Sequence, residues 1–473
     1  RTRCCYARRV HAAHRESVDQ VADIAIVGAG AAGLFAAIWA GRTFRQLGPS
    51  NASASASRHP RIIALDGARK LGAKILVAGG GRCNVTHHAV DESAYAGSSR
   101  NAIRNVLRAF PVARTVEFFA ELGVQLKREE TGKLFPTTDD AHTVLDALLA
   151  ECSRVHAELR HPWRVHRIER LGESGEPSTD GNAPRFLIHA APDSGHPPLQ
   201  ARTLILATGG MALPKSGSDG AGYAFARGLG HTITPLVTPA LVPITLDPAC
   251  FLRELSGVTL PASLTLLSGS GKKLVSFTNS TLLTHFGLSG PGPLDISRYW
   301  LEQANADPAC RLVMNFLPAM NVESLDAALV EARSMTMLRV FDRPATALPE
   351  RLVRAACAHA GIDPASTGAN LSRTARRALA TAICALELPA TGSRGYTFAE
   401  VTAGGVPLSE LRLDSMASRV TPGLHIVGEI CDVDGRIGGF NFQWAWASGY
   451  LAGVAAARAA IDAVGLTEHR PRA

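Results

Sequence analysis

The sequence lacks the features that define several special classes of protein. No uninterrupted apolar run reaches the roughly 18 residues that a membrane-spanning helix needs, so we expect no membrane partner. No internal repeat of fixed period occurs, which argues against a repeat architecture. Charged residues make up only 19% of the 473 residues and apolar residues 46%, the balance of a globular protein with a large core. This length favours two or three domains.

Cysteine motifs are also missing. The nine cysteines are scattered along the chain, their number is odd, and no C-x-x-C pair occurs. This spacing argues against a disulfide framework, a zinc ribbon and a thioredoxin-like redox pair. We therefore predict no metal site. The simplest setting is a reducing compartment, and we expect a cytoplasmic protein.

Acidic residues are scarce at the start of the chain. The first 20 residues hold five arginines against Glu16 and Asp19, which contributes +3 to the net charge of +8. Such a composition is typical of a transit peptide or of a disordered tail, and we expect a tail at residues 1–20. The basic balance by itself is a weak indication of anionic partners.

What the sequence does contain is a glycine-rich turn between a strand and a helix. An apolar run at residues 24–27 predicts a buried strand, and an alanine-rich helix follows the turn. The turn matches G-x-G-x-x-G in the context that this motif requires. Its first glycine permits a tight turn, its second lets the backbone approach a pyrophosphate, and its third allows close helix packing. The helix N-terminus offers N–H groups and a partial positive charge to phosphates. The predicted cofactor-binding residues here are Gly28, Gly30, Ala31, Ala32 and Gly33.

A carboxylate stands at the end of the next predicted strand. Asp66 ends the apolar run at 61–66, where it can accept hydrogen bonds from ribose hydroxyls. It lies 33 residues after Gly33, against roughly 20 in the usual fingerprint, and the polar stretch at 48–60 accounts for the surplus. The alternative is a glycine turn with an unrelated aspartate, which the combination of strand, helix and acid disfavours. The fingerprint does not separate FAD from NAD.

The texture of the sequence divides the remaining chain into segments. We assign residues 21–235 to the first part of a nucleotide-binding domain. Short apolar runs separated by Pro, Gly and Ser predict a β-rich domain at 236–318, and amphipathic helices broken by proline and glycine predict a helical domain at 319–390. Residues 391–473 return to the glycine-rich pattern, with a strand near 423–429 and a long helix at 440–463.

Five segments resemble the motifs of one known family. They are KILVAGGGRCNVTH (74–87), LATGGMALPKSGSDGAGYAFARGLGH (206–231), THFGLSGPGPLDIS (284–297), VTAGGVPLSEL (401–411) and GEICDVDGRIGGFNFQWAWASG (428–449). In this order they resemble the BaiN-like flavoprotein family, whose members are labelled NAD(P)/FAD-dependent oxidoreductases and sometimes aminoacetone oxidase-like FAD-binding proteins.

The resemblance implies an α/β fold and a cofactor. The implied architecture is a Rossmann-type FAD-binding domain of the two-dinucleotide type, split in sequence, with an inserted mainly-β domain and a small helical domain. Two departures from the family pattern stand out: the 48–60 insertion is longer, and Asp66 stands where the family more often has Glu. With either departure a carboxylate still stands at the end of the second strand, so we still expect FAD.

The resemblance also implies where the cofactor is held. The glycine-rich loop around 79–84 is expected against the flavin ring, with an ordinary glycine loop as the alternative. An acidic turn near 429–432 is expected at the ribityl or phosphate arm. The start of the last helix is expected at the pyrimidine edge, where negative charge grows on reduction. The further predicted cofactor-binding residues are Gly80, Gly81, Arg82, Cys83, Asn84, Thr208, Gly209, Gly210, Gly428, Glu429, Asp432, Gly438, Gly439, Phe440 and Asn441.

No catalytic residue can be named from the sequence. Cys83 and Cys431 lie in motif segments, but neither has a resolving cysteine nearby, and buried inert thiols are the expectation. His87, His88 and His285 could act as acids or bases, or could be structural. The segment GSGKK at 269–273 lacks phosphate-loop spacing and predicts a hairpin turn.

The sequence thus predicts an FAD-dependent oxidoreductase that moves electrons between a small-molecule substrate or NAD(P)H and FAD. No second G-x-G-x-x-G follows a strand, so NAD(P)H is expected to dock only transiently. Two alternatives stay open: a flavoprotein that binds or modifies RNA, and a non-catalytic FAD-binding sensor. Residues 321–390 hold eight arginines against seven acids, no concentrated basic footprint, so nucleic acid is not the expected partner. The oligomeric state is left open.

Overall fold

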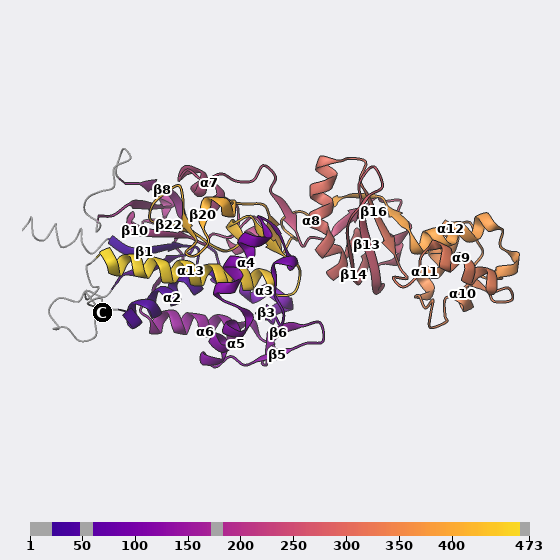
Figure 1. Cartoon of the computed structure of the whole chain (residues 1–473), viewed down its shortest axis with the longest axis horizontal. Helices are drawn as coiled ribbons and strands as arrows, with labels where there is room; N and C mark the ends of the chain where they lie inside the picture. The colour runs from indigo at the N-terminus through magenta and orange to yellow at the C-terminus, as the bar shows by residue number, and fades with distance from the viewer. Residues whose placement is uncertain (1–20, 48–59, 172–182, 464–473) are drawn as a thin grey trace, which may run out of the picture. The chain divides into compact units, whose positions relative to one another are not determined.

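The computed structural model describes residues 21–47, 60–171 and 183–463. The tail expected at 1–20 and most of the polar stretches at 48–60 and 172–184 lie outside the described residues. The chain forms two compact units (Figure 1). The first unit contains the chain up to Val237 and again from Thr402, and the second unit is Thr238–Val401.

The first unit is built on a nine-stranded sheet that takes strands from both ends of the chain. Its main path runs β20-β21-β22-β10-β1-β2-β7, and β8 and β9 continue from β10. β1 pairs in parallel with β2 and β10, and β22 pairs in parallel with β10. This parallel centre is the predicted split nucleotide-binding fold. The strands are β1 (Val21–Val27), β2 (Ile62–Leu65), β7 (Glu158–Arg160), β8 (Val165–Arg170), β9 (Phe186–Ala190), β10 (Leu199–Leu206), β20 (Leu411–Arg412), β21 (Ala417–Ser418) and β22 (Leu424–Ile426).

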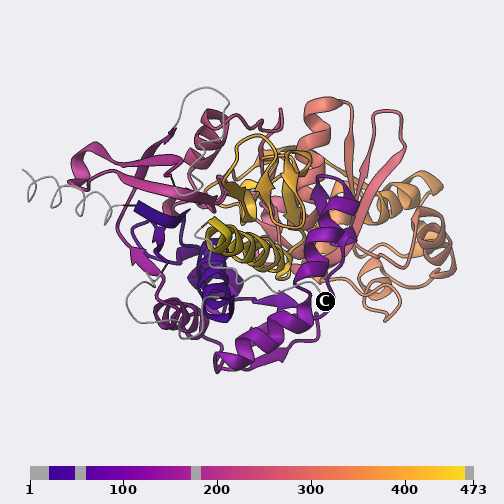
Figure 2. The ribbon, with the colours of Figure 1, turned by 60° about the vertical axis from the view of Figure 1, so that its left-hand side comes forward.

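Two helices from opposite ends of the sequence lie side by side in this unit. α2 (Ala31–Leu47) and α13 (Phe440–Ala463), indigo and yellow in Figure 2, make the most extensive helix contact of the unit. A Cβ added at Gly449 would lie 2.6 Å from the Ala32 carbonyl oxygen, and one at Gly453 would lie 2.3 Å from that of Ala36. The two glycines therefore allow backbone-to-backbone packing that a side chain would prevent.

The other elements of the first unit surround this sheet and helix pair. Its helices are α3 (Ala73–Gly81), α4 (Arg100–Ala109), α5 (Val112–Glu121), α6 (Ala141–Arg154) and α7 (Ala221–Gly228), with short 3₁₀ turns η1 (Glu92–Ala94), η2 (Pro192–Ser194), η3 (Pro214–Ser216), η6 (Leu408–Glu410) and η7 (Gly428–Ile430). Its remaining strands are β3 (Thr86–His87), β4 (Tyr95–Gly97), β5 (Leu126–Arg128), β6 (Lys133–Pro136), β19 (Val401–Ala403) and β23 (Val433–Gly435).

The second unit has an antiparallel sheet of seven strands in the order β17-β16-β13-β14-β15-β12-β18. Its strands are β11 (Thr238–Ala240), β12 (Ile244–Leu246), β13 (Thr259–Leu267), β14 (Lys273–Thr284), β15 (Gly287–Ser289), β16 (Arg311–Asn315), β17 (Leu386–Leu388) and β18 (Ala390–Ser393). Its helices are α8 (Pro291–Ala306), α9 (Val322–Glu331), α10 (Met337–Val340), α11 (Glu350–His359) and α12 (Arg373–Cys384), with η4 (Phe251–Leu255) and η5 (Gly368–Asn370).

One hydrophobic core joins the β-rich and helical segments of the second unit. Buried side chains from the sheet, such as Leu264 and Met314, belong to the same cluster as Leu329 and Leu352 from the helices. The sequence places a domain boundary between these segments, whereas the structure packs them into one unit. Helices α9–α12 gather at one end of the sheet (Figure 1).

Two local predictions differ from the structure. The apolar spacing over about residues 100–153 predicts helices, but this segment also contains the hairpin β5–β6, whose turn uses Gly132 at φ 86°. The region 236–318, predicted to be β-rich, contains the 16-residue helix α8, which begins at Pro291. Proline breaks a helix interior but fits its first turn, so the prolines that suggested a loop in fact stand at a helix start. The hairpin turn predicted at GSGKK is confirmed between β13 and β14.

Candidate functional site

All the predicted cofactor-binding residues lie in the first unit. The candidate site begins at the glycine turn that follows β1. Gly28 has φ 100°, and a Cβ there would lie 2.3 Å from the Ala207 carbonyl oxygen at the end of β10. A Cβ on Gly33 would lie 1.8 Å from the Gly28 carbonyl oxygen. A Cβ on Gly30 would have no atom within 4 Å. Two glycines thus permit tight packing, and the third faces open space at the start of α2.

Asp66 is tied to this turn. One carboxylate oxygen accepts a hydrogen bond from the backbone N–H of Ala29 and the other from that of Ala68, both at 2.8 Å. The carboxylate is therefore held at the carboxyl ends of β1 and β2, where the fingerprint places the ribose-binding acid. Its contact with a ribose remains a prediction, now with a fixed orientation.

The glycine-rich segment at the C-terminal end of α3 leaves the helical path and takes left-handed backbone conformations. Gly79, Gly80 and Gly81 have φ values of 58°, 71° and 88°, and Cys83 has φ 60°. A Cβ on Gly79 would lie 2.7 Å from the Phe135 ring, whereas one on Gly80 would meet nothing within 4 Å. The segment is thus packed on one side and open on the other, as a loop against a flat ligand would be.

Asn84 has a buried oxygen with nothing to bind. The residue is 7% exposed, and its Oδ1 atom finds no hydrogen-bond partner among the residues that the structure describes. An unsatisfied buried acceptor costs about 1–3 kcal/mol, so such atoms call for a partner outside the protein chain. Asn84 therefore supports a ligand that donates a hydrogen bond at this point.

Arg82 points elsewhere. Its guanidinium pairs with Glu129 at 2.6 Å and lies over the Phe135 ring at 4.1 Å. These contacts with β6 and its flanking turn occupy the side chain, so a cofactor contact by its guanidinium remains a prediction that the geometry does not favour.

Glu429 lies between the predicted glycine pair and a lysine that the sequence did not suggest. Its carboxylate pairs with Lys74 Nζ at 2.5 Å and accepts a hydrogen bond of 3.1 Å from the Thr402 N–H. A Cβ on Gly210 would lie 2.9 Å from Glu429 Oε1, and one on Gly209 would lie 4.0 Å from Oε2. The predicted segments around 208–210 and 428–432 are therefore adjacent, and Lys74 and Thr402 join them.

Thr208 and Gly428 also occupy crowded backbone positions. A Cβ on Gly222 would lie 1.8 Å from Thr208 Oγ1, and a Cβ on Gly428, at φ 77°, would lie 2.9 Å from the Ala32 Cβ. The Gly428 N–H donates to Ser448 Oγ of α13 at 3.1 Å. Gly428 thus fixes the acidic turn against both α2 and α13.

The start of α13 is held by strand β3. Gly438 and Gly439 have φ values of 131° and 93°, and a Cβ on Gly439 would lie 2.5 Å from the Thr86 carbonyl carbon. The His87 ring stacks on Phe440 with 4.9 Å between centroids and 20° between planes. This arrangement brings the predicted glycine pair next to the histidine that ends the KILVAGGGRCNVTH motif.

Asn441 has a structural contact. Its side-chain amide forms two hydrogen bonds of 2.8 Å with the backbone of Gly435. Tyr95 donates from its hydroxyl to the Phe440 carbonyl oxygen at 2.7 Å. Both contacts clamp the turn that precedes α13, so the predicted cofactor contact of Asn441 is left to its backbone and remains a prediction.

The histidines suggested as acids or bases have different surroundings. His87 Nδ1 lies 2.8 Å from the Ala89 carbonyl oxygen, and Nε2 lies 3.1 Å from that of Thr131. His88 is exposed in the same unit, and His285 is exposed in the second unit. Within the first unit, His87 stacks directly on Phe440, one of the predicted cofactor residues.

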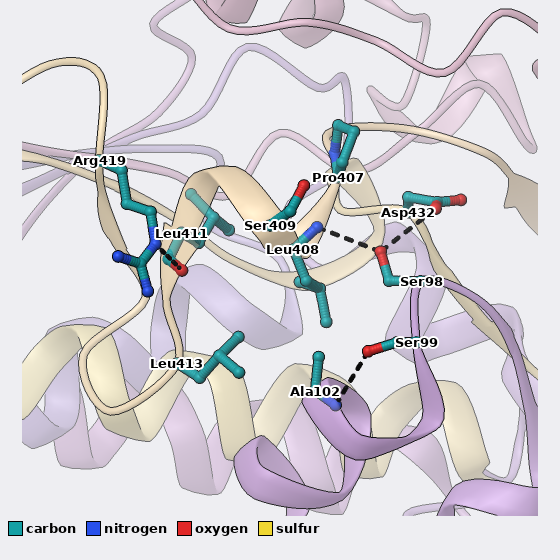
Figure 3. A pocket seen from close by; sticks show the side chains of 10 residues that line it. All are labelled: Ser98, Ser99, Ala102, Pro407, Leu408, Ser409, Leu411, Leu413, Arg419 and Asp432. Carbon is teal, nitrogen blue, oxygen red and sulfur yellow. Dashed lines mark hydrogen bonds between the residues drawn. The ribbon is translucent and has the colours of Figure 1, made fainter.

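Asp432 lies at the edge of a pocket that sequence reasoning missed. Ser98 Oγ donates to its carboxylate at 3.2 Å and accepts from the Leu408 N–H at 3.1 Å (Figure 3). The cavity has a volume of about 380 Å³ between the N-terminus of α4 and the 407–413 turn. The residues lining it are Ser98, Ser99, Ala102, Pro407, Leu408, Ser409, Leu411, Leu413, Arg419 and Asp432.

The two motif cysteines are inert. Cys83 and Cys431 are both 0% exposed and free. Burial raises the pKa of the Cys83 thiol to about 12 and raises that of Cys431 further. Because the thiolate is the nucleophile, neither is poised for redox or adduct chemistry, in agreement with the sequence-based expectation.

Together these observations fit a bound dinucleotide. The first N–H groups of α2 have no partner within the helix, and Gly30 leaves the space before them open. Gly80 opens on free space, and Asn84 presents an unsatisfied oxygen. The structure brings several of the predicted segments together and adds Lys74 and Thr402 beside Glu429. By contrast, three predicted side chains have contacts of their own, those of Arg82, Asn441 and Asp432.

Comparison with known proteins places these features in context. A family model described as HI0933-like protein Rossmann domain matches residues 22–455. A ribosomal RNA dihydrouridine synthase of Haemophilus influenzae is 32% identical over 442 residues, 93% of this chain and 100% of that protein. A 3-dehydro-bile acid delta(4,6)-reductase of Clostridium scindens is 33% identical over 92% of this chain and 98% of its own length. A ribosomal RNA dihydrouridine synthase of Escherichia coli is 31% identical over 90% of this chain and 96% of its own length.

Proposed function

The chain belongs to the HI0933-like family of Rossmann-domain proteins, and on this premise we propose that it is an FAD-dependent oxidoreductase that saturates a carbon–carbon double bond conjugated with a carbonyl group. Membership confirms the family resemblance that the five sequence motifs indicated. The FAD-binding part of the proposal rests on one observation above all. In the turn after β1, Gly28 and Gly33 have no room for a side chain, while Gly30 faces open space.

The names of the relatives support the choice of reaction. Dihydrouridine is uridine whose ring double bond, conjugated with a carbonyl, has been saturated. A delta(4,6)-reductase of a 3-dehydro-bile acid saturates double bonds conjugated with the 3-keto group. These substrates differ in size and setting, but the bond that is reduced is of one kind. The shared chemistry therefore supports a reductase of conjugated double bonds.

The reaction balances with NAD(P)H as the donor. A hydride adds to the carbon β to the carbonyl, a proton adds to the α carbon, and NAD(P)H is oxidised to NAD(P)⁺. When bound, FAD supplies the hydride-transfer chemistry that links the two half-reactions. No second G-x-G-x-x-G follows a strand in the sequence, which supports a nicotinamide that docks only for its own half-reaction.

The residues of the first unit have separate tasks in this scheme. The N-terminus of α2, opened by Gly30, would hold the pyrophosphate, and Asp66 would orient the adenosine ribose. Glu429, fixed by Lys74, would bind the ribityl arm. The N-terminus of α13, after Gly438 and Gly439, would stabilise negative charge at the pyrimidine edge.

An anaerobic two-step experiment tests the proposal. The purified chain, loaded with FAD, is first mixed with NADH or NADPH, and the loss of flavin absorbance is followed by stopped flow. The reduced protein is then mixed with a uridine-containing ribosomal RNA fragment or with a 3-keto-Δ4 steroid. We expect one of them to restore the absorbance and to gain two hydrogen atoms by mass spectrometry. A protein that binds no FAD, or whose reduced form neither substrate reoxidises, would contradict the proposal.

The same experiment separates the remaining alternative. A non-catalytic sensor would bind FAD and show no electron transfer from either nicotinamide. The substrate whose mass increases by two hydrogen atoms shows whether the protein reduces RNA or a small molecule.

A further inference from the structure

A partly exposed arginine packs against two phenylalanine rings in the second unit. The Arg394 guanidinium carbon is 3.9 Å from the ring centroid of Phe398 and 4.5 Å from that of Phe286. Phe398 is 48% exposed, one of few large apolar side chains on the described surface. The exposed ring of His285 packs edge-on against Phe286 at 5.1 Å. We call Phe286, Arg394 and Phe398 the aromatic–arginine cluster.

No ion pair among the residues that the structure describes neutralises the positive charge of this cluster. Arg394 forms no ion pair with any residue in the described part of the chain. The same holds for Arg253, whose Nε donates to the His285 carbonyl oxygen at 2.7 Å. By contrast, Arg354 on α11 of the same unit pairs with Glu350 at 2.6 Å. Two uncompensated guanidinium groups therefore flank an exposed aromatic face.

We propose that the aromatic–arginine cluster binds an unpaired nucleotide of an RNA substrate, with a base stacked on Phe398 and the adjoining phosphate on Arg394. Aromatic faces bind unstacked bases, and arginine binds phosphate and stacks on the same rings. A hydrophobic protein partner would match the ring but leave two guanidinium charges unpaired. A single-stranded nucleotide matches both ring and charge.

The sequence positions of the cluster agree with this assignment. Phe286 belongs to the THFGLSGPGPLDIS motif, which no part of the cofactor scheme uses, and Arg394 and Phe398 lie seven and three positions before the first residue of the VTAGGVPLSEL motif. The assignment rests on the proposed function and deepens it, because it selects RNA over a small ketone as the substrate. It does not need the basic stretch that residues 321–390 lack, since recognition of one unpaired nucleotide depends on stacking more than on net charge.

Binding measured without turnover tests the proposal. The full-length FAD-loaded protein is titrated into a fluorescently labelled single-stranded oligouridine RNA, and anisotropy is followed. We expect Phe398→Ala and Arg394→Gln each to weaken binding by about 5- to 100-fold, the range of one lost stacking contact. The control Arg354→Gln removes an exposed arginine from the same unit and should leave the affinity unchanged. Because Phe398 is exposed and Arg394 is partly exposed, thermal unfolding should be unaltered in every variant.

Three results would overturn the proposal. The first is an equal affinity of wild type and Phe398→Ala for the RNA. The second is a KM for NADPH in flavin reduction that rises in these variants while RNA binding is unchanged, which would assign the cluster to the nicotinamide nucleotide. The third is a KM for a 3-keto-Δ4 steroid that rises while RNA is not bound at all. Failure of the proposed reduction is recognised separately, since reduced FAD would then persist whether or not RNA binds.

Discussion

At the scale of single residues, three glycines of one turn differ in what surrounds them. The motif itself predicted a tight turn at Gly28, a phosphate approach at Gly30 and close packing at Gly33, because each task follows from a missing side chain. The structure adds the distances that separate these tasks: added Cβ atoms at Gly28 and Gly33 would meet backbone, and one at Gly30 would not.

Substitution of these glycines should separate binding from folding. Gly30→Val should leave the thermal stability of the apoprotein unchanged, because its side chain enters open space, and should weaken FAD binding by about tenfold or more. Gly33→Ala places a Cβ 1.8 Å from a carbonyl oxygen and should lower the free energy of unfolding by about 3 kcal/mol. Differential scanning fluorimetry and FAD titration measure the two effects. An equally destabilised Gly30→Val apoprotein would contradict this account.

Substitution of Asn84 should also affect the stability of the apoprotein and its affinity for FAD in opposite directions. Asn84→Leu removes a buried acceptor that lacks a partner, so the apoprotein should become more stable by about 1 kcal/mol. FAD affinity should fall, because the hydrogen bond to the ligand is lost. Denaturant unfolding of the apoprotein and FAD titration form the test. A variant that loses stability and keeps its FAD affinity would show that Oδ1 has no ligand role.

The site residues that could not be predicted from the sequence are those that reach the site only through the tertiary fold. Lys74 and Glu429 are 355 positions apart in the chain. Thr402, whose N–H donates to Glu429, follows the inserted unit in the sequence. No local pattern predicts such partners. Lys74 does begin a motif that was recognised, which is the one signal that could have directed attention to it. Ser98 and the pocket beside Asp432 had no comparable signal.

At the scale of elements, segments with a clear apolar pattern were predicted well. The expected helix at 440–463 has the bounds of α13, and the strand expected at 61–66 contains β2. The hairpin β5–β6 was missed because its strands, LKR and KLFP, lack the uninterrupted apolar run that marked β2. Helix α8 was missed because Pro291 at its first turn looks like a breaker in sequence.

The contact of α13 with α2 should control both stability and cofactor binding. Gly453→Val would place a Cβ 2.3 Å from the Ala36 carbonyl oxygen, which should cost about 3 kcal/mol and displace the two helix starts that face the cofactor. We expect a lower melting temperature and weaker FAD binding. The control Ala459→Val also creates a β-branched side chain, on the exposed face of α13, and should change neither. Unaltered FAD affinity in a destabilised Gly453→Val protein would separate the helix contact from the site.

Strand β22 should make the first unit sensitive to mild acid. His425 is 5% exposed, and burial lowers its pKa below the ordinary value of 6.5. Its Nδ1 lies 2.9 Å from the Ser415 carbonyl oxygen, to which a neutral ring can donate. Since the unfolded chain takes up a proton that the folded chain resists, this contribution is complete above pH 6.5 and is lost as pH falls from there toward the folded pKa.

The acid sensitivity has a direct measurement. The free energy of unfolding of the wild type should fall below pH 6.5 by up to about 1.4 kcal/mol per pH unit from this residue. In His425→Asn, where the amide can keep the hydrogen bond without titrating, that part of the slope should vanish. Urea unfolding at several pH values compares the two, and parallel curves for both proteins would show that His425 is not responsible.

At the scale of the whole molecule, the second unit is inserted between two neighbouring points of the first unit. The Thr234 N–H donates to the Gly405 carbonyl oxygen, and the Gly405 N–H donates to Thr234 Oγ1, both at 2.9 Å. The chain therefore leaves the first unit and returns to it at neighbouring points. Composition predicted the insertion, but it did not predict that the β-rich and helical segments would share one core, since that depends on contacts between distant segments.

Removal of the insertion should leave a folded flavin-binding protein. Because the exit and return points are adjacent, a short Gly/Ser linker from Val237 to Thr402 can replace the second unit. We expect this shortened protein to bind FAD with an affinity close to that of the full chain, measured by titration. It should also lose RNA binding, because it lacks Phe286, Arg394 and Phe398. An insoluble or FAD-free product would mean that the first unit needs the second to fold.

The pairing of β22 with β10 has a consequence for synthesis on the ribosome. Leu424–Ile426 must emerge before the central sheet can be completed, and the helix that closes the cofactor site comes later still. Nascent chains that stop short of this point contain the whole G-x-G-x-x-G turn but lack the strand and the helix that complete the proposed cofactor site. Acquisition of yellow colour would therefore report that synthesis has passed β22 and α13.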